Sequence, residues 1–69
     1  MVLSKAEIGK PVCIREIQGE NEMRKHLGEL GLVVGEEVSI VLKCAGNFIL
    51  QVKDSRLALD AGMVNRIII

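Results

Sequence analysis

Two runs of alternating apolar residues, separated by a short turn-forming segment, limit what this chain can fold into. Each run has an apolar residue at every second position: Val38, Ile40, Leu42 and Cys44 in the first, then Phe48, Leu50 and Val52 in the second. Successive side chains of a strand point to opposite faces, so each run gathers these residues on one face. The segment Ala45-Gly46-Asn47 lies between the runs and has turn chemistry. The sequence therefore predicts a β-hairpin with one apolar face.

Three further segments have strand character, so the chain is predicted to be mostly β. They are Pro11 to Ile17, Arg56-Leu57-Ala58-Leu59 and Arg66-Ile67-Ile68-Ile69. Breaker residues at Gly19, Asp54-Ser55 and Asp60-Ala61-Gly62 separate the strands. About five short strands cannot leave two apolar sheet edges open, so we expect them to close into a small barrel.

One segment changes to a helical period. Met23, Leu27 and Leu30 are spaced i, i+4 and i+7, which predicts one inserted short α-helix from Asn21 to Leu30 that its leucines anchor. Asn21 is the expected N-cap. Gly31 is expected to end the helix in the left-handed conformation, with Leu32 folding back onto the last turn. A capping box at Ser4-Lys5-Ala6-Glu7 predicts one further helical turn or a turn-like lead-in.

The length and composition allow a single domain over residues 1–69. A chain of 69 residues buries only about 60% of the surface that its unfolded form exposes. The core must be aliphatic, because Phe48 is the only aromatic residue while 49% of the residues are hydrophobic. Such a small aliphatic core leaves no pocket for a bulky cofactor, and no cofactor is expected.

The charge balance and hydropathy exclude several kinds of partner. Nine basic residues face nine acidic ones, and Trp and Tyr are absent. Nucleic-acid binding is therefore not expected, because it needs a basic surface or aromatic stacking platforms. Direct membrane insertion is not expected either, because no apolar run is long enough to cross a bilayer. With no targeting signal and only two isolated cysteines, Cys13 and Cys44, we expect a cytoplasmic protein.

The sequence carries no arrangement that predicts catalysis. It has no nucleophile elbow, no phosphate-binding glycine loop and no carboxylate pair with a defined geometric role. Gly31 and Gly35 are better explained as turn residues at the two ends of the segment after the helix. We therefore do not expect an enzyme.

One stretch resembles a known family. The segment from His26 to Val38 has a basic residue, the pattern L-x-E-L-G-L, two linking residues and then G-x-x-V. Ile8-Gly9-Lys10 and Arg56-Leu57-Ala58-Leu59 agree with the opening and the late strand of the same pattern. The chain thus resembles the FeoA family of small SH3-like barrels, which are associated with the ferrous iron transporter FeoB. The resemblance implies an SH3-like barrel with one inserted helix.

The sequence departs from that family pattern at three places. His26 stands where an arginine is common, and Val34 stands where the family often has proline. The hairpin at Ala45-Gly46-Asn47 is shorter than usual and lacks its typical proline. A partner contact attributed to that hairpin is therefore not carried over to this chain.

The helix and the turn after it form the candidate partner-binding surface. Leu32-Val33-Val34 places three apolar residues in a row, and they cannot all point inward. An exposed apolar patch with a charged border is typical of interaction sites. The predicted site residues are Arg24, His26, Glu29, Leu32, Val33 and Val34, with Lys25 also at the polar rim. The alternative is a solvated helix face beside a partly buried turn. Proline-rich peptide recognition is excluded, because it needs an aromatic groove.

His26 and the two cysteines are the residues with metal-binding chemistry. A metal site needs three or four convergent ligands, which the spacing does not indicate, so the simpler expectation is a surface pair of Glu22 with His26. A divalent transition metal held by His26 and a carboxylate remains the alternative. Cys44 is expected to be buried with the apolar face of its strand, while Cys13 is ambiguous.

Three functional hypotheses follow. The resemblance implies a regulatory protein that docks on the cytoplasmic side of a FeoB-like membrane GTPase transporter and influences ferrous iron uptake. The second hypothesis is a metal-responsive sensor module, resembling the SH3-like domain of iron-dependent repressors. The third is a weak homo-oligomer built through the C-terminal strand Ile67-Ile68-Ile69.

Overall fold

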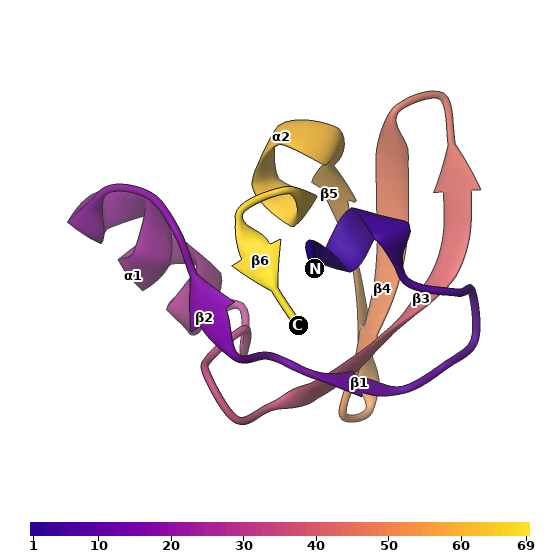
Figure 1. Cartoon of the computed structure of the whole chain (residues 1–69), viewed down its shortest axis with the longest axis horizontal. Coiled ribbons are helices and arrows are strands. Elements are labelled where there is room, and N and C mark those ends of the chain that lie inside the picture. The colour runs from indigo at the N-terminus through magenta and orange to yellow at the C-terminus, as the bar shows by residue number, and fades with distance from the viewer.

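The computed structural model describes residues 1–69 and contains six strands and one main helix. In chain order the elements are η1 (Leu3–Lys5), β1 (Val12–Cys13), β2 (Glu16–Ile17), α1 (Asn21–Glu29), β3 (Glu37–Cys44), β4 (Asn47–Val52), β5 (Ser55–Asp60), α2 (Ala61–Val64) and β6 (Ile67–Ile68). Figure 1 shows α1 at one side of the strands and the β3–β4 hairpin at the opposite side. The mostly-β fold with one inserted helix, predicted from the sequence, is confirmed.

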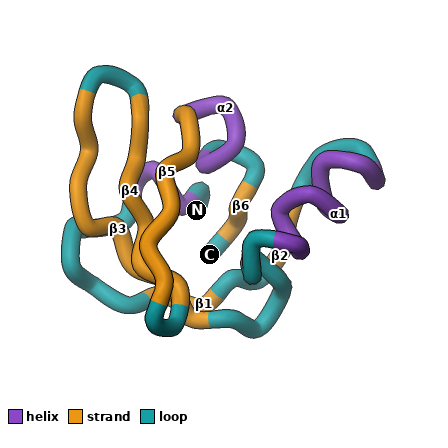
Figure 2. Tube along the Cα trace, turned by 180° about the vertical axis from the view of Figure 1, so that it is seen from behind, coloured by secondary structure: helices purple, strands orange, loops and turns teal.

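The strands form two sheets. The larger sheet has the order β1-β3-β4-β5 with antiparallel pairing, and the smaller one pairs β2 with β6. The two sheets enclose one core in an SH3-like, barrel-shaped arrangement, but no continuous ladder of hydrogen bonds closes the barrel. The expectation that the strands leave no open sheet edge is therefore wrong: the larger sheet keeps free edges at its two ends, on the β1 side and at β5 (Figure 2).

The first predicted strand is two strands in the structure. The segment from Pro11 to Ile17 divides into β1, where Val12 pairs with Val38, and β2, where Ile17 pairs with Ile67. Between them lies Ile14, which is buried. The chain turns from one sheet to the other around this side chain. One segment of sequence therefore takes part in both sheets.

The core is aliphatic, as the composition predicted. It contains 14 buried residues, all of them hydrophobic, and Phe48 is its only aromatic member. From the hairpin it takes the inward residues of β3 and β4: Val38, Ile40, Phe48, Leu50 and Val52. No buried side-chain nitrogen or oxygen lacks a hydrogen bond, so the core contains no polar site.

A β-bulge in β3 changes the face of the last residues of that strand. The register with β4 shifts between Ile40 and Leu42. Leu42 is 48% exposed and Cys44 is exposed, so the predicted burial of Cys44 with the inner face of the strand is wrong. The extra residue of a bulge reverses the alternation of side chains beyond it.

The same bulge places a lysine at the end of the core. Lys43 pairs with Phe48, and its ammonium nitrogen lies 5.7 Å from the centroid of the Phe48 ring. The ammonium group also donates a hydrogen bond to the carbonyl oxygen of Ser4, at 3.0 Å. The ammonium group of Lys43 thereby lies over the only aromatic ring while the residue remains exposed.

The C-terminal end of α1 follows the sequence prediction. The amide of Leu32 donates to the carbonyl of Leu27 at 2.9 Å, and the amide of Gly31 donates to that of Gly28 at 3.0 Å. With Gly31 at φ +90°, these two bonds form a Schellman motif. Leu27 and Leu32 are fully buried, but Leu30 is 37% exposed and does not anchor the helix as expected.

The predicted caps at helix starts are wrong in both places. Glu20, not Asn21, occupies the N-cap position of α1, and its side chain makes no capping bond. The Asn21 side chain instead accepts a hydrogen bond from Arg24. Near the start of the chain, Ser4 donates its hydroxyl hydrogen bond to Asn65, so the expected capping box does not form.

The tight turn between β3 and β4 leads to a stability prediction. Its two central residues, Ala45 and Gly46, have φ angles of 48° and 81°. A left-handed conformation is unfavourable for alanine and is far better tolerated by asparagine. We expect Ala45→Asn to raise the free energy of unfolding by about 0.5–1 kcal/mol, as measured by urea denaturation.

Gly46→Ala provides the matched control for that prediction. It introduces a Cβ at the second left-handed position and is expected to lower the free energy of unfolding by about 1 kcal/mol. No atom lies within 4 Å of where that Cβ would be, so the effect would come from the backbone alone. A destabilising effect of Ala45→Asn would contradict the assigned turn geometry.

Candidate functional site

A shallow groove runs between α1, β2 and the segment that connects α1 to β3. It has a volume of about 490 Å³. Its lining includes three cationic side chains, from Arg15, Arg24 and Lys25, and the apolar side chains of Ile17, Val33 and Val34. We call this feature the α1 groove. It combines exposed apolar surface with positive charge.

The cations of the α1 groove are not neutralised by neighbouring carboxylates. The only ion pair in the structure joins Lys53 to Glu36, with 3.7 Å between Nζ and Oε2. Glu16 is the only acidic residue of the groove lining, and its carboxylate accepts a hydrogen bond from Gln18 at 3.4 Å. The groove is therefore locally positive although the whole chain has no formal net charge.

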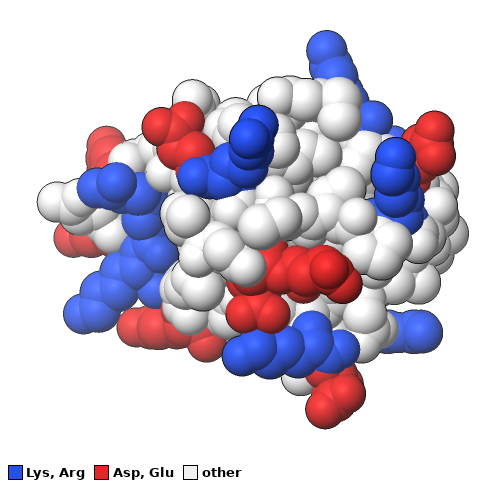
Figure 3. Space-filling model, turned by 60° about the horizontal axis from the view of Figure 1, so that its bottom comes forward, with Lys and Arg blue, Asp and Glu red and all other residues white.

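The wider surface has mixed charge. On the face drawn in Figure 3, basic and acidic side chains are interspersed around uncharged areas, with no broad field of one sign. Val33 and Val34 are 45% and 64% exposed. Apolar side chains beside unpaired cations make the α1 groove a surface suited to binding another macromolecule.

Helix geometry decides which side chains of α1 reach the groove. Asn21, Arg24 and Lys25 line it, at the i, i+3 and i+4 positions of one helix face. Gly28 continues that face, and a Cβ at its position would lie 3.8 Å from Cγ1 of Val33. The small residue lets the apolar segment after the helix approach the helix closely.

The structure separates the six predicted site residues into three groups. Arg24, Val33 and Val34 come together at the α1 groove. His26 and Glu29 are exposed but share a different stripe of α1 with Glu22, spaced i, i+4 and i+7, and they do not line the groove. The third group is Leu32 alone.

The prediction that Leu32 contacts a partner is corrected by the structure. Its side chain is fully buried, because the Schellman motif turns it back onto Leu27. It belongs to the floor of the α1 groove, below the exposed Val33 and Val34, and has no exposed surface for a partner to contact. The sequence prediction that the three residues cannot all point inward is confirmed, with Leu32 as the one that does.

The sequence prediction missed four residues of the groove lining, namely Glu16, Ile17, Asn21 and Arg15, and of these only Arg15 is a cation. Arg15 lies between β1 and β2, at the corner where the chain passes from one sheet to the other. Its amide donates to the carbonyl of Ile68 at 2.8 Å, which fixes the backbone there. No local signal identifies Arg15, because its proximity to α1 depends on how the two sheets pack.

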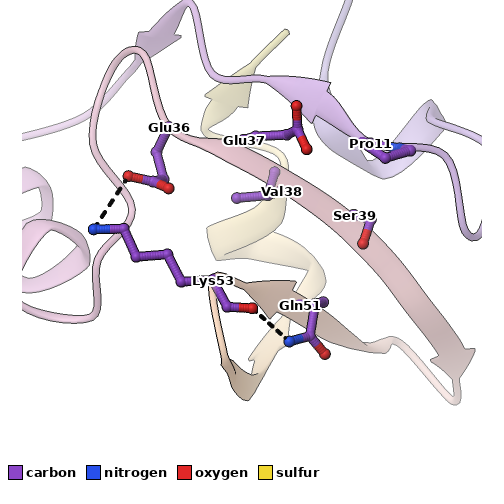
Figure 4. A pocket seen from close by; sticks show the side chains of 7 residues that line it. All are labelled: Pro11, Glu36, Glu37, Val38, Ser39, Gln51 and Lys53. Carbon is purple, nitrogen blue, oxygen red and sulfur yellow. Dashed lines mark hydrogen bonds and ion pairs between the residues drawn. The ribbon is translucent and has the colours of Figure 1, made fainter.

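A second hollow is polar and lies on the larger sheet. Figure 4 shows Glu36, Glu37 and Ser39 from the β3 side and Gln51 and Lys53 from the β4 side around it. Its volume is about 360 Å³, and the Lys53–Glu36 ion pair spans it. The Gln51 amide donates to the carbonyl of Lys53 at 2.7 Å. Two of its three charged groups, Lys53 and Glu36, already pair with each other, and its aliphatic lining residue Val38 is buried. We therefore place the candidate site at the α1 groove.

The structure does not gather metal-ligating residues. It contains no group of three or more His, Cys, Asp and Glu residues that could hold a metal ion. Cys13 and Cys44 are both exposed free thiols. The expected ion pair of Glu22 with His26 does not form either.

No helix has the length and apolar character that spanning a membrane requires.

The FeoA domain family model matches residues 1–69. The chain belongs to the FeoA family. The resemblance predicted from the L-x-E-L-G-L pattern is thereby confirmed. No curated protein matches the sequence.

Solved structures agree with the family assignment. A FeoA from Stenotrophomonas maltophilia, solved with zinc and described as a prokaryotic SH3 domain protein, is 30% identical, with a TM-score of 0.85; the match covers 99% of this chain and 87% of that one. An iron uptake regulatory protein (FeoA) is 24% identical, with a TM-score of 0.89, and the match covers 97% of this chain and 91% of that one.

A third neighbour shows how widely the fold is used. A manganese-dependent transcriptional repressor is 13% identical, with a TM-score of 0.87; the match covers 97% of this FeoA-family chain and 39% of the repressor. At this identity the likeness shows the fold alone. Architecture alone therefore does not separate this chain from the matched part of that repressor.

The packing beneath the α1 groove leads to a second stability prediction. Leu32→Ala removes a fully buried side chain and is expected to lower the free energy of unfolding by about 2–4 kcal/mol. Val34→Ala at the exposed side of the same segment is the control, with an expected change within about 0.5 kcal/mol. Equal effects in thermal or urea unfolding would contradict the inward orientation of Leu32.

Proposed function

We propose that this chain is a cytoplasmic accessory protein of ferrous iron transport that docks on a FeoB-like membrane GTPase transporter. The observation that carries the proposal is the family match over residues 1–69. The structural neighbour described as an iron uptake regulatory protein supports the same process. The α1 groove supplies a surface for such a contact, since apolar Val33 and Val34 are exposed beside three unpaired cations.

The proposed mechanism is binding without catalysis. Docking that prefers one conformation of the transporter shifts the population of conformations toward it, by no more than the difference in affinity allows. The exposed valines contribute apolar area, and the cations contribute orientation and association rate. The buried Leu27 and Leu32 beneath the surface hold it in shape before binding.

Charge reversal at the groove tests where docking occurs. We expect Lys25→Glu to weaken binding to the purified full-length transporter in nanodiscs by about tenfold or more, because it places a carboxylate at a positive contact surface. Glu29→Lys is the matched control, a charge reversal on the stripe of α1 that does not line the groove, and is expected to leave affinity within about twofold.

The possible outcomes distinguish an error in the proposed docking site from an error in the proposed function. If both reversals bind as the unaltered chain does, the α1 groove is not the docking site. If the unaltered chain does not bind the transporter, and its deletion leaves transporter-dependent ferrous iron uptake unchanged, the proposed function is wrong. Reduced uptake with Lys25→Glu but not with Glu29→Lys would connect the groove to transport.

The second hypothesis, a metal-responsive sensor, is tested by metal titration. We propose that docking needs no bound metal, and we expect calorimetric titration with Zn(II) to show no stoichiometric site. A one-to-one site that His26→Ala abolishes would support the sensor hypothesis. The Cys13→Ser variant is the control, because an exposed thiol can also bind zinc.

A further inference from the structure

The outer edge of β5 is a free sheet edge of six residues. β5 pairs only with β4, and none of the backbone hydrogen bonds outside the regular elements involves residues of β5. Figure 2 shows β5 at the front of the molecule, with no other element drawn across it. Unpaired edges of this length bind other strands unless something blocks them.

The pairing with β4 determines which backbone groups face outward. Ser55 pairs with Val52 across a two-residue turn, and residues that flank such a turn form a hydrogen-bonded pair. The alternation then directs the amide and carbonyl groups of Leu57 and Leu59 toward β4. Those of Arg56 and Ala58 and the amide of Asp60 point to the free edge, while the carbonyl of Asp60, the N-cap residue of α2, accepts the first hydrogen bond of that helix.

The side chains on this edge are self-complementary. Arg56, Ala58 and Asp60 are all exposed and lie on the same face of β5, because they alternate along the strand. If a second β5 pairs antiparallel about Ala58, each Arg56 lies directly opposite the Asp60 of the other copy. In this register, Arg56, Ala58 and Asp60 of one copy lie opposite Asp60, Ala58 and Arg56 of the other. These positions are the hydrogen-bonded pairs of the new ladder, because their amide groups point outward. Direct opposition of unlike charges favours such pairing.

Arg56 and Asp60 each keep side-chain atoms that make no hydrogen bond within the chain and are available for this contact. Arg56 donates from Nε to Gln51 Oε1 at 2.9 Å, which leaves its terminal nitrogens without a partner. Asp60 accepts the Met63 amide at its Oδ1, also at 2.9 Å, which leaves its Oδ2 without one. Neither side chain takes part in an ion pair within the chain.

We propose that the outer edge of β5 binds a second copy of this chain, in antiparallel register centred on Ala58, and joins two four-stranded sheets into one. The two-fold symmetry makes the contact isologous, with two Arg56–Asp60 pairs. The edge is short, so the dimer is weak and forms at high protein concentration. This proposal is independent of docking on a transporter.

The other edges of the structure are less suited to self-association. The C-terminal strand, expected from the sequence to mediate oligomers, has partners on both sides. β2 pairs with β6 on one side, and Val2 and Met1 contact Ile68 and Ile69 on the other. β1 has only two residues and follows Pro11, which has no amide hydrogen. The outer edge of β3 is also unpaired beyond Ile40, but only over the four residues from Val41 to Cys44 after the bulge. β5 is therefore the longest unpaired edge.

Sedimentation equilibrium and NMR amide hydrogen exchange, both measured up to millimolar concentration, test the proposal. We expect a monomer–dimer equilibrium, with the amides of Arg56, Ala58 and Asp60 becoming protected as concentration rises. Arg56→Glu places like charges opposite each other twice and is expected to weaken the dimer by at least about tenfold. Lys10→Glu, the same charge change at an exposed site away from β5, should leave the dimer unchanged.

A backbone variant separates strand pairing from charge effects. Ala58→Pro removes the amide hydrogen at the centre of the proposed contact and should abolish the dimer. The monomer should still fold, because the Ala58 amide points away from β4 and makes no hydrogen bond within the sheet. Ala58→Ser keeps that amide and should dimerise normally. A monomer at every concentration, or a dimer that survives both Arg56→Glu and a folded Ala58→Pro variant, would overturn the proposal.

Discussion

The burial of Ile14 at the corner between two strands is the interaction on which the rest of the structure depends. On one side of Ile14, β1 joins the larger sheet through Val12 and Val38, and on the other side β2 joins β6 through Ile17 and Ile67. The amide of Ile14 also donates to the carbonyl of Glu36 at 2.9 Å. Since the two sheets share one core and no closed ladder joins them, this short segment fixes their relative orientation.

The α1 groove follows from that orientation. The corner brings Arg15 to the side of α1, and the Schellman motif at Gly31 brings the apolar segment back against the same helix face. Leu32 enters the core there, so Val33 and Val34 must remain outside. A small domain has too little interior to bury every apolar residue, and what remains at the surface becomes available for binding.

The incomplete closure of the barrel has a similar consequence. Two sheets of unequal size enclose a 14-residue core but leave the edge of β5 unpaired. Charged residues on an edge usually prevent strand addition. On β5, Arg56 and Asp60 are symmetric about Ala58, so the same charges that oppose most strands favour an antiparallel copy of this strand.

Much of the fold could be predicted because its determinants are local. The alternation from Val38 to Val52 specified the hairpin, and Gly31 with Leu32 specified the end of the helix, since each pattern states a backbone geometry within a few residues. The resemblance to the FeoA family was predicted mainly from the same local segment, L-x-E-L-G-L, and the family model over residues 1–69 confirms it. The candidate site was partly predicted, because Arg24, Val33 and Val34 lie in or beside that segment.

Only the tertiary structure decided which neighbours these elements meet. The bulge in β3 moved Leu42 and Cys44 to the outside, and a bulge depends on the pairing partner more than on the strand's own residues. The Ser4 hydroxyl donates to Asn65 instead of forming the expected capping box. Arg15 lines the groove because the corner between β1 and β2 places it beside α1. The sequence by itself determined the local backbone geometry and the apolar pattern. The packing of the two sheets decided which side chains meet across the chain, because such contacts depend on residues far apart in sequence.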